Sequence, residues 1–210
     1  MPLQNRVDPW GRLHAVSTKA GTLMGNRGIL HNEERVVVKQ WVSKSWVACD
    51  PKFKSIDRRP LFQPRRYSEL FFLDEATAFS AGHRPCAYCQ RARFNNFKSV
   101  WHGIFESGSD ARSLEITRVD AVLHQDRVSP ARTKMTYLAK VHELPDGALF
   151  EFQGEARLVH KGRHLLWSHT GYLTATPIPK EEEVAVLTPR SFVQLYLAGY
   201  TPHVHASADA

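Results

Sequence analysis

The chain has 210 residues, of which 42% are hydrophobic and 23% charged, as in an ordinary soluble globular protein with one large or two small domains. Its formal net charge of +7 indicates an anionic partner, and nucleic acid is the first candidate because phosphate neutralisation drives such binding. Its three cysteines are too few for a disulfide framework, and the sequence shows neither a signal peptide nor a membrane-spanning apolar run. We therefore expect a cytoplasmic protein with no membrane partner.

The first β pattern begins at Ile29. Three short runs rich in β-branched and aromatic residues cover residues 29–31, 35–41 and 45–49. The connections between them are short enough for hairpins. The pattern predicts an antiparallel β meander in which Cys49 ends the third strand.

Residues 50–66 form a proline-containing loop with a surplus of positive charge. Only Asp50 and Asp57 are acidic there. The basic residues of the loop are Lys52, Lys54, Arg58, Arg59, Arg65 and Arg66. The loop is either a solvated connection or an arm that contacts phosphates, and the concentration of charge favours the arm.

A strand, a short helix and a longer helix are predicted next. After an apolar strand at 67–73, Asp74 is a suitable N-cap for a helix that ends at Gly82. A second helix follows Cys89 and runs to about residue 101, with Phe94, Phe97 and Trp101 on its apolar face. The basic residues of this region, Arg84, Arg91 and Arg93, are further candidates for nucleic-acid contacts.

The remainder is predicted to contain one more helix, a β-rich part and a final helix. A Gly/Ser/Asp stretch at 103–113 is the expected boundary, followed by a helix over 114–127. Strands are expected at 148–152, 156–160 and 164–167, and a final helix begins after Thr188-Pro189 and ends at Gly199. The predicted regions are 1–105, 106–202 and a flexible tail, 203–210. The fold class is α+β: an antiparallel β meander with a small zinc-binding helical module, then a β-rich C-terminal part that ends in a helix.

Cys86 and Cys89 have the spacing of a metal site. Two thiolates three positions apart can occupy adjacent corners of a zinc tetrahedron, and zinc is the ion that such sites usually select. Cys49 is the natural third ligand and His31, on a neighbouring strand, the predicted fourth; Asp50, His83 and His102 are the alternatives. Two other interpretations remain open: Cys86 and Cys89 could form a redox Cys-x-x-Cys pair, and Cys49 could be a buried residue that binds no metal.

The stretch from Asp74 to Cys89, DEATAFSAGHRPCAYC, resembles the end of the Ada-type metal-binding domain. The shared pattern is a short Glu-Ala helix, then Gly, Arg-Pro-Cys and a second cysteine. Cys86 and Cys89 match the later cysteine pair of that family. The resemblance implies zinc bound through cysteines, association with DNA, and repair chemistry in which a zinc-bound thiolate accepts a methyl group from a DNA phosphotriester.

Three functions follow as hypotheses. The first is a zinc-containing, DNA-associated protein of the bacterial cytoplasm that acts in repair or defence. The second is an enzyme on nucleic acid, either a nuclease or a methyl acceptor; its acid–base groups could be Glu69, Asp74 or Asp120. Any catalytic site is then expected around Arg6, Arg12, His14, Arg27, His31 and Cys49. The third is a structural zinc module that binds another protein. Catalytic residues, and whether the chain is an enzyme at all, stay undetermined.

Overall fold

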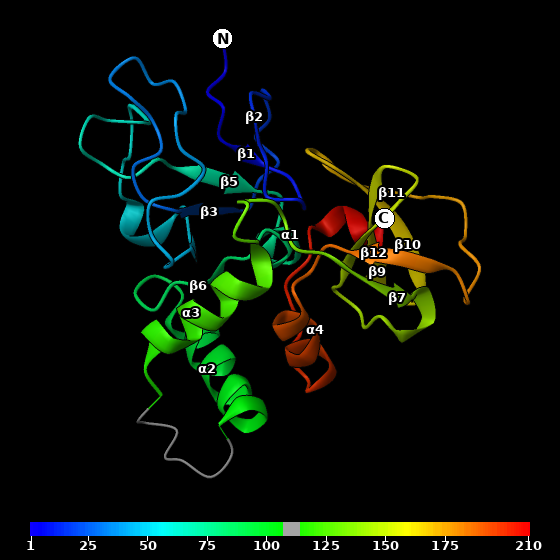
Figure 1. The fold of residues 1–210 in the computed structure, drawn as a ribbon. Coiled ribbons are helices and arrows are strands. Elements are labelled where there is room, and N and C mark those ends of the chain that lie inside the picture. The colour runs from blue at the N-terminus through cyan, green and yellow to red at the C-terminus, as the bar shows by residue number, and fades with distance from the viewer. Residues whose placement is uncertain (107–113) are drawn as a thin grey trace.

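The computed structural model describes residues 1–106 and 114–210, which form an α+β fold around two six-stranded sheets (Figure 1). The first sheet is mixed and has the order β2 (Leu13–His14), β1 (Arg6–Val7), β5 (Leu70–Phe72), β3 (Leu23–Asn26), β4 (Val47–Cys49) and β6 (Arg84–Pro85). The second is antiparallel and has the order β11 (Gly171–Leu173), β10 (Arg163–Ser168), β9 (Glu155–His160), β8 (Leu149–Phe152), β12 (Glu183–Val186) and β7 (Tyr137–Lys140). The α-helices are α1 (Glu75–Ser80), α2 (Arg91–Phe105), α3 (Ile116–Arg127) and α4 (Arg190–Leu197). None of the helices described combines the length and apolar character needed to cross a membrane.

The predicted N-terminal meander is wrong in its first two strands. β3 pairs antiparallel with both β4 and β5, whereas the segment between β3 and β4 contributes only an isolated bridge between His31 and Val37. Val36 and Val38, which suggested a strand, are 55% and 58% exposed. Gly25 permits the close pairing of β3, since a Cβ there would lie 2.2 Å from the carbonyl oxygen of Val47.

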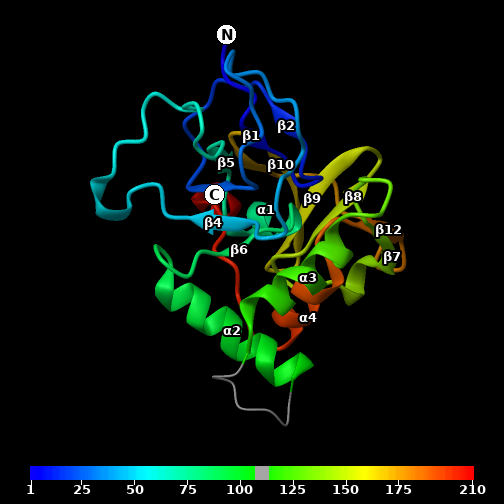
Figure 2. The same cartoon turned by 60° about the vertical axis from the view of Figure 1, so that its left-hand side comes forward.

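α1 begins and ends as predicted and joins the two sheets at the centre of the molecule (Figure 2). Asp74 caps the helix, and its Oδ1 accepts hydrogen bonds from the backbone and the hydroxyl of Thr77 at 2.8 and 2.7 Å. Its Oδ2 accepts from the hydroxyl of Tyr172 in β11 at 2.8 Å. Gly82 ends the helix at φ +86°, and a Cβ there would collide with the side chain of Arg127.

The predicted boundary near 103–113 does not separate two cores. Residues 107–113 lie outside the described part, but residues before and after them share one buried cluster: it contains Phe97 and Trp101 of α2, Leu123 of α3 and Phe192 of α4. The helices themselves are confirmed, as are the strands corresponding to β8, β9 and β10. A second cluster packs Leu73 against Leu149, so the halves of the chain are also joined between the sheets.

The last residues pack onto α1, contrary to the flexible tail expected there. The carbonyl of His203 accepts a hydrogen bond from Glu75 N at 3.1 Å, and His205 N donates to Asp74 Oδ2 at 2.9 Å. A 3₁₀ turn, Ala206–Asp209, then buries Ala208. The start of a buried helix, with its free N–H groups, thus fixes the C-terminal segment.

Candidate metal centre and cationic cavity

The three cysteines come together in space. Their Sγ atoms all lie within 4.8 Å of one another, close enough to ligate one metal ion. Cys49 ends β4, and parallel pairing of β4 with β6 brings Cys86 beside it, with Cys86 N donating to the Ala48 carbonyl at 2.8 Å. Cys89 follows in the turn that leads into α2.

Hydrogen bonds link the sulfur atoms of the three cysteines. Hydrogen bonding with Cys86 and burial raise the pKa of Cys49, whereas the same hydrogen bond, against the opposing effect of burial, lowers the pKa of Cys86 to about 5. The backbone N–H of Asp50 donates to Cys89 Sγ at 3.3 Å, an outer contact typical of metal thiolates. Sulfur atoms on a zinc tetrahedron lie about 3.8 Å apart, given a Zn–S distance of about 2.3 Å. The donor set therefore fits a soft metal ion.

None of the predicted fourth ligands joins this group. His31 is held elsewhere: its Nδ1 lies 2.6 Å from Ser68 Oγ and its Nε2 3.2 Å from the carbonyl oxygen of Gln63. His83 is fully buried, and its Nε2 accepts from Arg27 Nε at 3.3 Å. Asp50 and His102 likewise contribute no atom to the group. Within the described chain, the cluster consists of the three cysteines alone.

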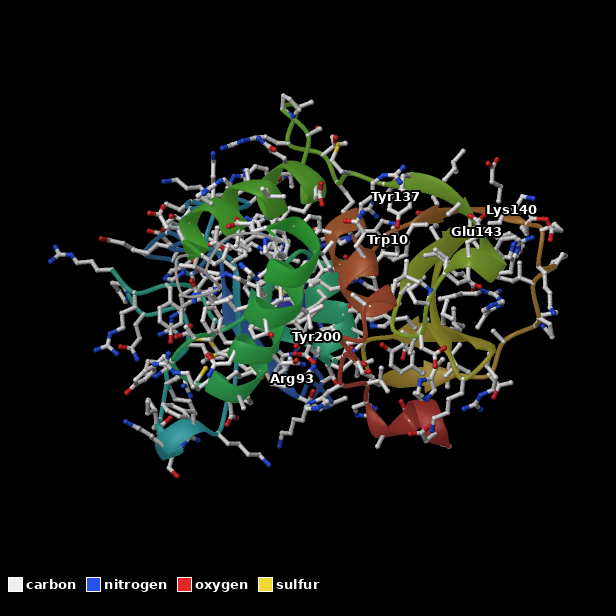
Figure 3. All side chains as sticks on the ribbon, turned by 90° about the horizontal axis from the view of Figure 1, so that it is seen from below. Trp10, Arg93, Tyr137, Lys140, Glu143 and Tyr200 are labelled. Atoms are coloured by element: carbon white, nitrogen blue, oxygen red, sulfur yellow. The ribbon has the colours of Figure 1, made fainter. Side chains whose placement is uncertain are left out.

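Two of the predicted nucleic-acid contacts, Arg84 and Arg93, have their charges paired within the fold. Arg84 is 4% exposed and forms a bidentate pair with Asp120, at 2.7 and 2.8 Å. Arg93 pairs with the buried Glu75, and its guanidinium lies 4.5 Å from the ring centre of Tyr200 (Figure 3). Arg84 thus joins β6 to α3, and Arg93 joins α2 to α1.

The other predicted contacts lie at the surface. Arg59, Arg65, Arg66 and Arg91 are exposed, and Arg58 donates to the carbonyl of Pro51 at 2.8 Å. Arg59 forms an exposed pair with Asp57.

The acidic residues proposed as acid–base groups have structural roles. Asp74 caps α1, Asp120 pairs with Arg84, and Glu69 Oε2 accepts from Phe62 N at 2.8 Å. All three are buried.

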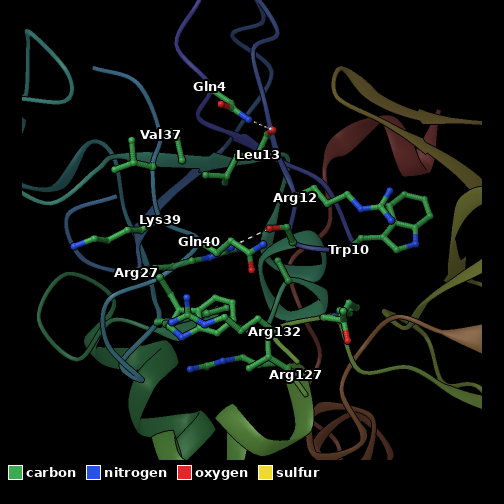
Figure 4. A pocket seen from close by; sticks show the side chains of 18 residues that line it. Gln4, Trp10, Arg12, Leu13, Arg27, Val37, Lys39, Gln40, Arg127 and Arg132 are labelled. Atoms are coloured by element: carbon green, nitrogen blue, oxygen red, sulfur yellow. Dashed lines mark hydrogen bonds between the residues drawn. The ribbon is translucent and has the colours of Figure 1, made fainter. Parts of the chain in front are cut away.

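A cationic cavity of about 580 Å³ lies at the junction of the first sheet with α1 and α3 (Figure 4). Three tryptophans line it: Trp10, Trp41 and Trp46. Among the residues that the structure describes, its lining includes no acidic residue but six basic ones: Arg12, Arg27, Lys39, Arg127, Arg132 and Lys134. Sequence reasoning singled out only Arg12 and Arg27 of this set. The overlooked signal is that Trp41 and Trp46 stand among Lys39, Lys44 and other polar residues.

Arg27 and Arg127 form the floor of the cationic cavity. They are 3% and 1% exposed, and their guanidinium carbons lie 4.2 and 3.9 Å from the ring centre of Trp46. Both donate to backbone carbonyls, Arg27 to Gly11 and Arg127 to Gly82. Arg27 Nη2 and Arg127 Nε nevertheless find no partner among the described residues.

The positive charges that line the cavity repel one another. Burial lowers the pKa of both Arg27 and Arg127 to about 9, and that of Lys134 to about 7. The charges of the two arginines contribute to the shift of Lys134, and only Asp8 acts in the other direction. Buried charges are normally paired, so an unpaired group of like charges is costly unless an anion binds.

Comparisons with protein-family models, curated proteins and solved structures found no match for this chain. The resemblance of residues 74–89 to the Ada-type domain therefore stays a prediction.

Proposed function

We propose that this protein is a zinc-containing, nucleic-acid-binding protein that takes an unpaired nucleotide of single-stranded DNA into the cationic cavity. The observation that carries the proposal is the pair of buried guanidiniums, Arg27 and Arg127, which have unpartnered N–H groups beside the ring of Trp46. Guanidinium groups are the preferred ligands of phosphate, and aromatic rings stack on nucleobases.

The shape of the cavity favours a single strand over a duplex. In a duplex the bases are stacked on one another, so a tryptophan inside a concave site can reach only a base that has left the stack. Trp41 lies at the same wall as the exposed Arg132, whose guanidinium is 4.9 Å from its ring centre. This wall offers a flat aromatic surface and a phosphate ligand side by side.

Zinc is the ion proposed for Cys49, Cys86 and Cys89, and its role is structural. It would tie the end of β4 to the turn before α2. Three protein ligands leave one tetrahedral position for a ligand from outside the cluster. The basic loop at residues 50–66 supplies secondary, sequence-independent phosphate contacts, through Arg58, Arg59, Arg65 and Arg66, together with Arg91.

The test is fluorescence anisotropy of a labelled single-stranded DNA oligonucleotide, with two double variants that remove the same charge. Lys39→Gln/Arg132→Gln removes two exposed cations at the rim of the cavity, and Arg65→Gln/Arg66→Gln removes two exposed cations of the loop. We expect the cavity variant to bind about tenfold or more weakly, since it loses two rim charges, including the guanidinium beside Trp41. The loop variant should lose less affinity and show a smaller salt dependence.

Equal affinity of the cavity variant and the unmodified protein would overturn the proposed function. Binding of duplex as tight as that of the single strand would remove the argument for an unpaired nucleotide.

A further inference from the structure

A second cavity, of about 420 Å³, adjoins the cationic cavity, and Trp10 and Arg12 line both. Its other walls are Asp8, His14, Glu151, Gly154, Trp167 and His169. These residues come from both sheets: His14 lies in β2, at one edge of the first sheet, and His169 in the turn between β10 and β11, at the end of the second. The rings of His14 and His169 meet edge to face with their centres 5.0 Å apart.

His14 is oriented by a buried carboxylate. Its Nε2 lies 2.7 Å from Oδ2 of Asp8, and the side chains are 38% and 5% exposed. Because Asp8 Oδ1 also accepts from Arg12 N at 2.9 Å, the carboxylate is fixed in place. An ionised carboxylate only accepts hydrogen bonds, so it holds a proton of His14 on Nε2 and fixes the orientation of the ring. Nδ1 is then the atom that can exchange a proton with a ligand.

His169 stands in a different environment. Burial and the nearby charges of His14 and Arg6 lower its pKa, with Asp8 opposing them. Trp167 packs on its other side, with ring centres 4.7 Å apart. The remaining charged groups at this cavity are Arg12 and Glu151, and Glu151 Oε2 accepts from Trp10 Nε1 at 2.7 Å. Two neighbouring imidazoles, one oriented by a buried carboxylate and the other with a lowered pKa, have a geometry that suits an acid–base pair.

We propose that His14 and His169 form a catalytic site that cleaves a phosphodiester bond of the strand held in the cationic cavity. This inference rests on the proposed function, because the cationic cavity must deliver the phosphate. Arg12 and Trp10, shared by the two cavities, place the next linkage of a bound strand at the histidine pair.

The reaction is a hydrolysis that needs no other reactant. Neutral His169 takes a proton from a water molecule as the water oxygen forms a bond to phosphorus. The bond from phosphorus to the leaving oxygen breaks, and imidazolium His14 gives its proton to that oxygen. The products are an alcohol and a phosphate monoester, and proton transfer from His169 to His14 through solvent restores the site.

The test measures cleavage and binding separately, on the full-length protein. The substrate is a single-stranded DNA oligonucleotide with a fluorophore and a quencher at its ends, used as all-DNA and with one ribonucleotide inserted. The variants are His14→Gln and His169→Gln, and the matched control is His142→Gln, an exposed histidine hydrogen-bonded to the carbonyl of Lys180. Anisotropy of an unquenched oligonucleotide gives the affinity of each protein.

We expect cleavage by the unmodified protein and the control, and a loss of about 100-fold or more in each site variant, with affinities within twofold of one another. The rate should follow a bell-shaped pH profile, because His169 must be neutral and His14 protonated. Asp8 is a positioning residue that orients the His14 ring, so Asp8→Asn should lower kcat and leave KM nearly unchanged. Cleavage of only the ribonucleotide strand would support the same pair with the 2′-hydroxyl as nucleophile.

Binding without cleavage of either strand would overturn this inference and leave the proposed function intact. Cleavage that persists in a His14→Gln/His169→Gln double variant would overturn it as well. Absence of binding at low salt would instead overturn the proposed function.

Discussion

At the scale of the residue, the cysteine cluster depends most on Cys86. Its thiol is the one with the lowered pKa, about 5, and the largest cause is its hydrogen bond with Cys49. We predict that the purified protein carries one zinc ion per chain and that Cys86→Ser lowers the affinity for zinc by about 100-fold or more, because a hydroxyl replaces a thiolate ligand. Native mass spectrometry with and without a chelator measures both. Ala87→Ser adds the same hydroxyl one position away and should keep the metal. Three freely alkylated cysteines in the untreated protein would contradict the prediction.

Lys134 makes anion binding depend on pH. Its Nζ donates to the carbonyl of Ser80, and burial lowers its pKa to about 7. Below pH 7 the ammonium is present in the free protein and attracts an anion. Above pH 7 the free site has lost this proton and must take it up again on binding, so we expect the affinity for the oligonucleotide to fall by up to about tenfold per pH unit between pH 7 and 8.5.

Lys134→Met should flatten this pH dependence. Lys39→Met removes one charge from the exposed rim of the same cavity, so it should weaken binding and keep the slope. Equal slopes in the unmodified protein and Lys134→Met would show that another group titrates.

At the scale of the element, β6 is tied to α3 by the pair between Arg84 and Asp120. Their side chains are 5% and 7% exposed. We predict that Asp120→Ala lowers the free energy of unfolding by about 3–5 kcal/mol, because it leaves a buried guanidinium without its partner. Urea denaturation measures the loss. Asp57→Ala breaks an arginine–aspartate pair that is open to solvent and should leave the midpoint unchanged, and a similar loss in both variants would refute the distinction.

The elements that sequence predicted correctly are those set by local signals. The Asp74 cap and Gly82 define α1, and the spacing of Phe94, Phe97 and Trp101 defines α2. β3 and β5 pair although they are far apart in the sequence, and such pairing leaves no local pattern. The same contrast between local signals and long-range contacts explains which candidate sites could be predicted from the sequence. The spacing of Cys86 and Cys89 is visible in the sequence, whereas the cationic cavity combines residues 4, 10–13, 27, 37–41, 46, 81, 127, 128 and 132–134.

At the scale of the whole molecule, the two cavities occupy places where parts of the chain meet. The cationic cavity lies where α1 and α3 meet the first sheet, and the second cavity lies between the edges of the two sheets. A site of this kind carries a cost for the free protein, since like charges are buried around it. Function and stability are then opposed at the same residues.

Arg27→Met should separate the effect of this residue on ligand binding from its effect on stability. The variant removes a buried cation that has no carboxylate partner in the described part of the chain, so we expect the free protein to be at least as stable as the unmodified one. Single-stranded oligonucleotide at about 100 times its Kd should stabilise the unmodified protein by about 2.7 kcal/mol, because it binds only the folded state. Arg27→Met should lose most of this gain. Arg66→Met, at an exposed position of the basic loop, should keep it, and thermal unfolding with and without oligonucleotide compares the three proteins. Equal stabilisation of Arg27→Met and Arg66→Met would mean that the ligand binds outside the cationic cavity.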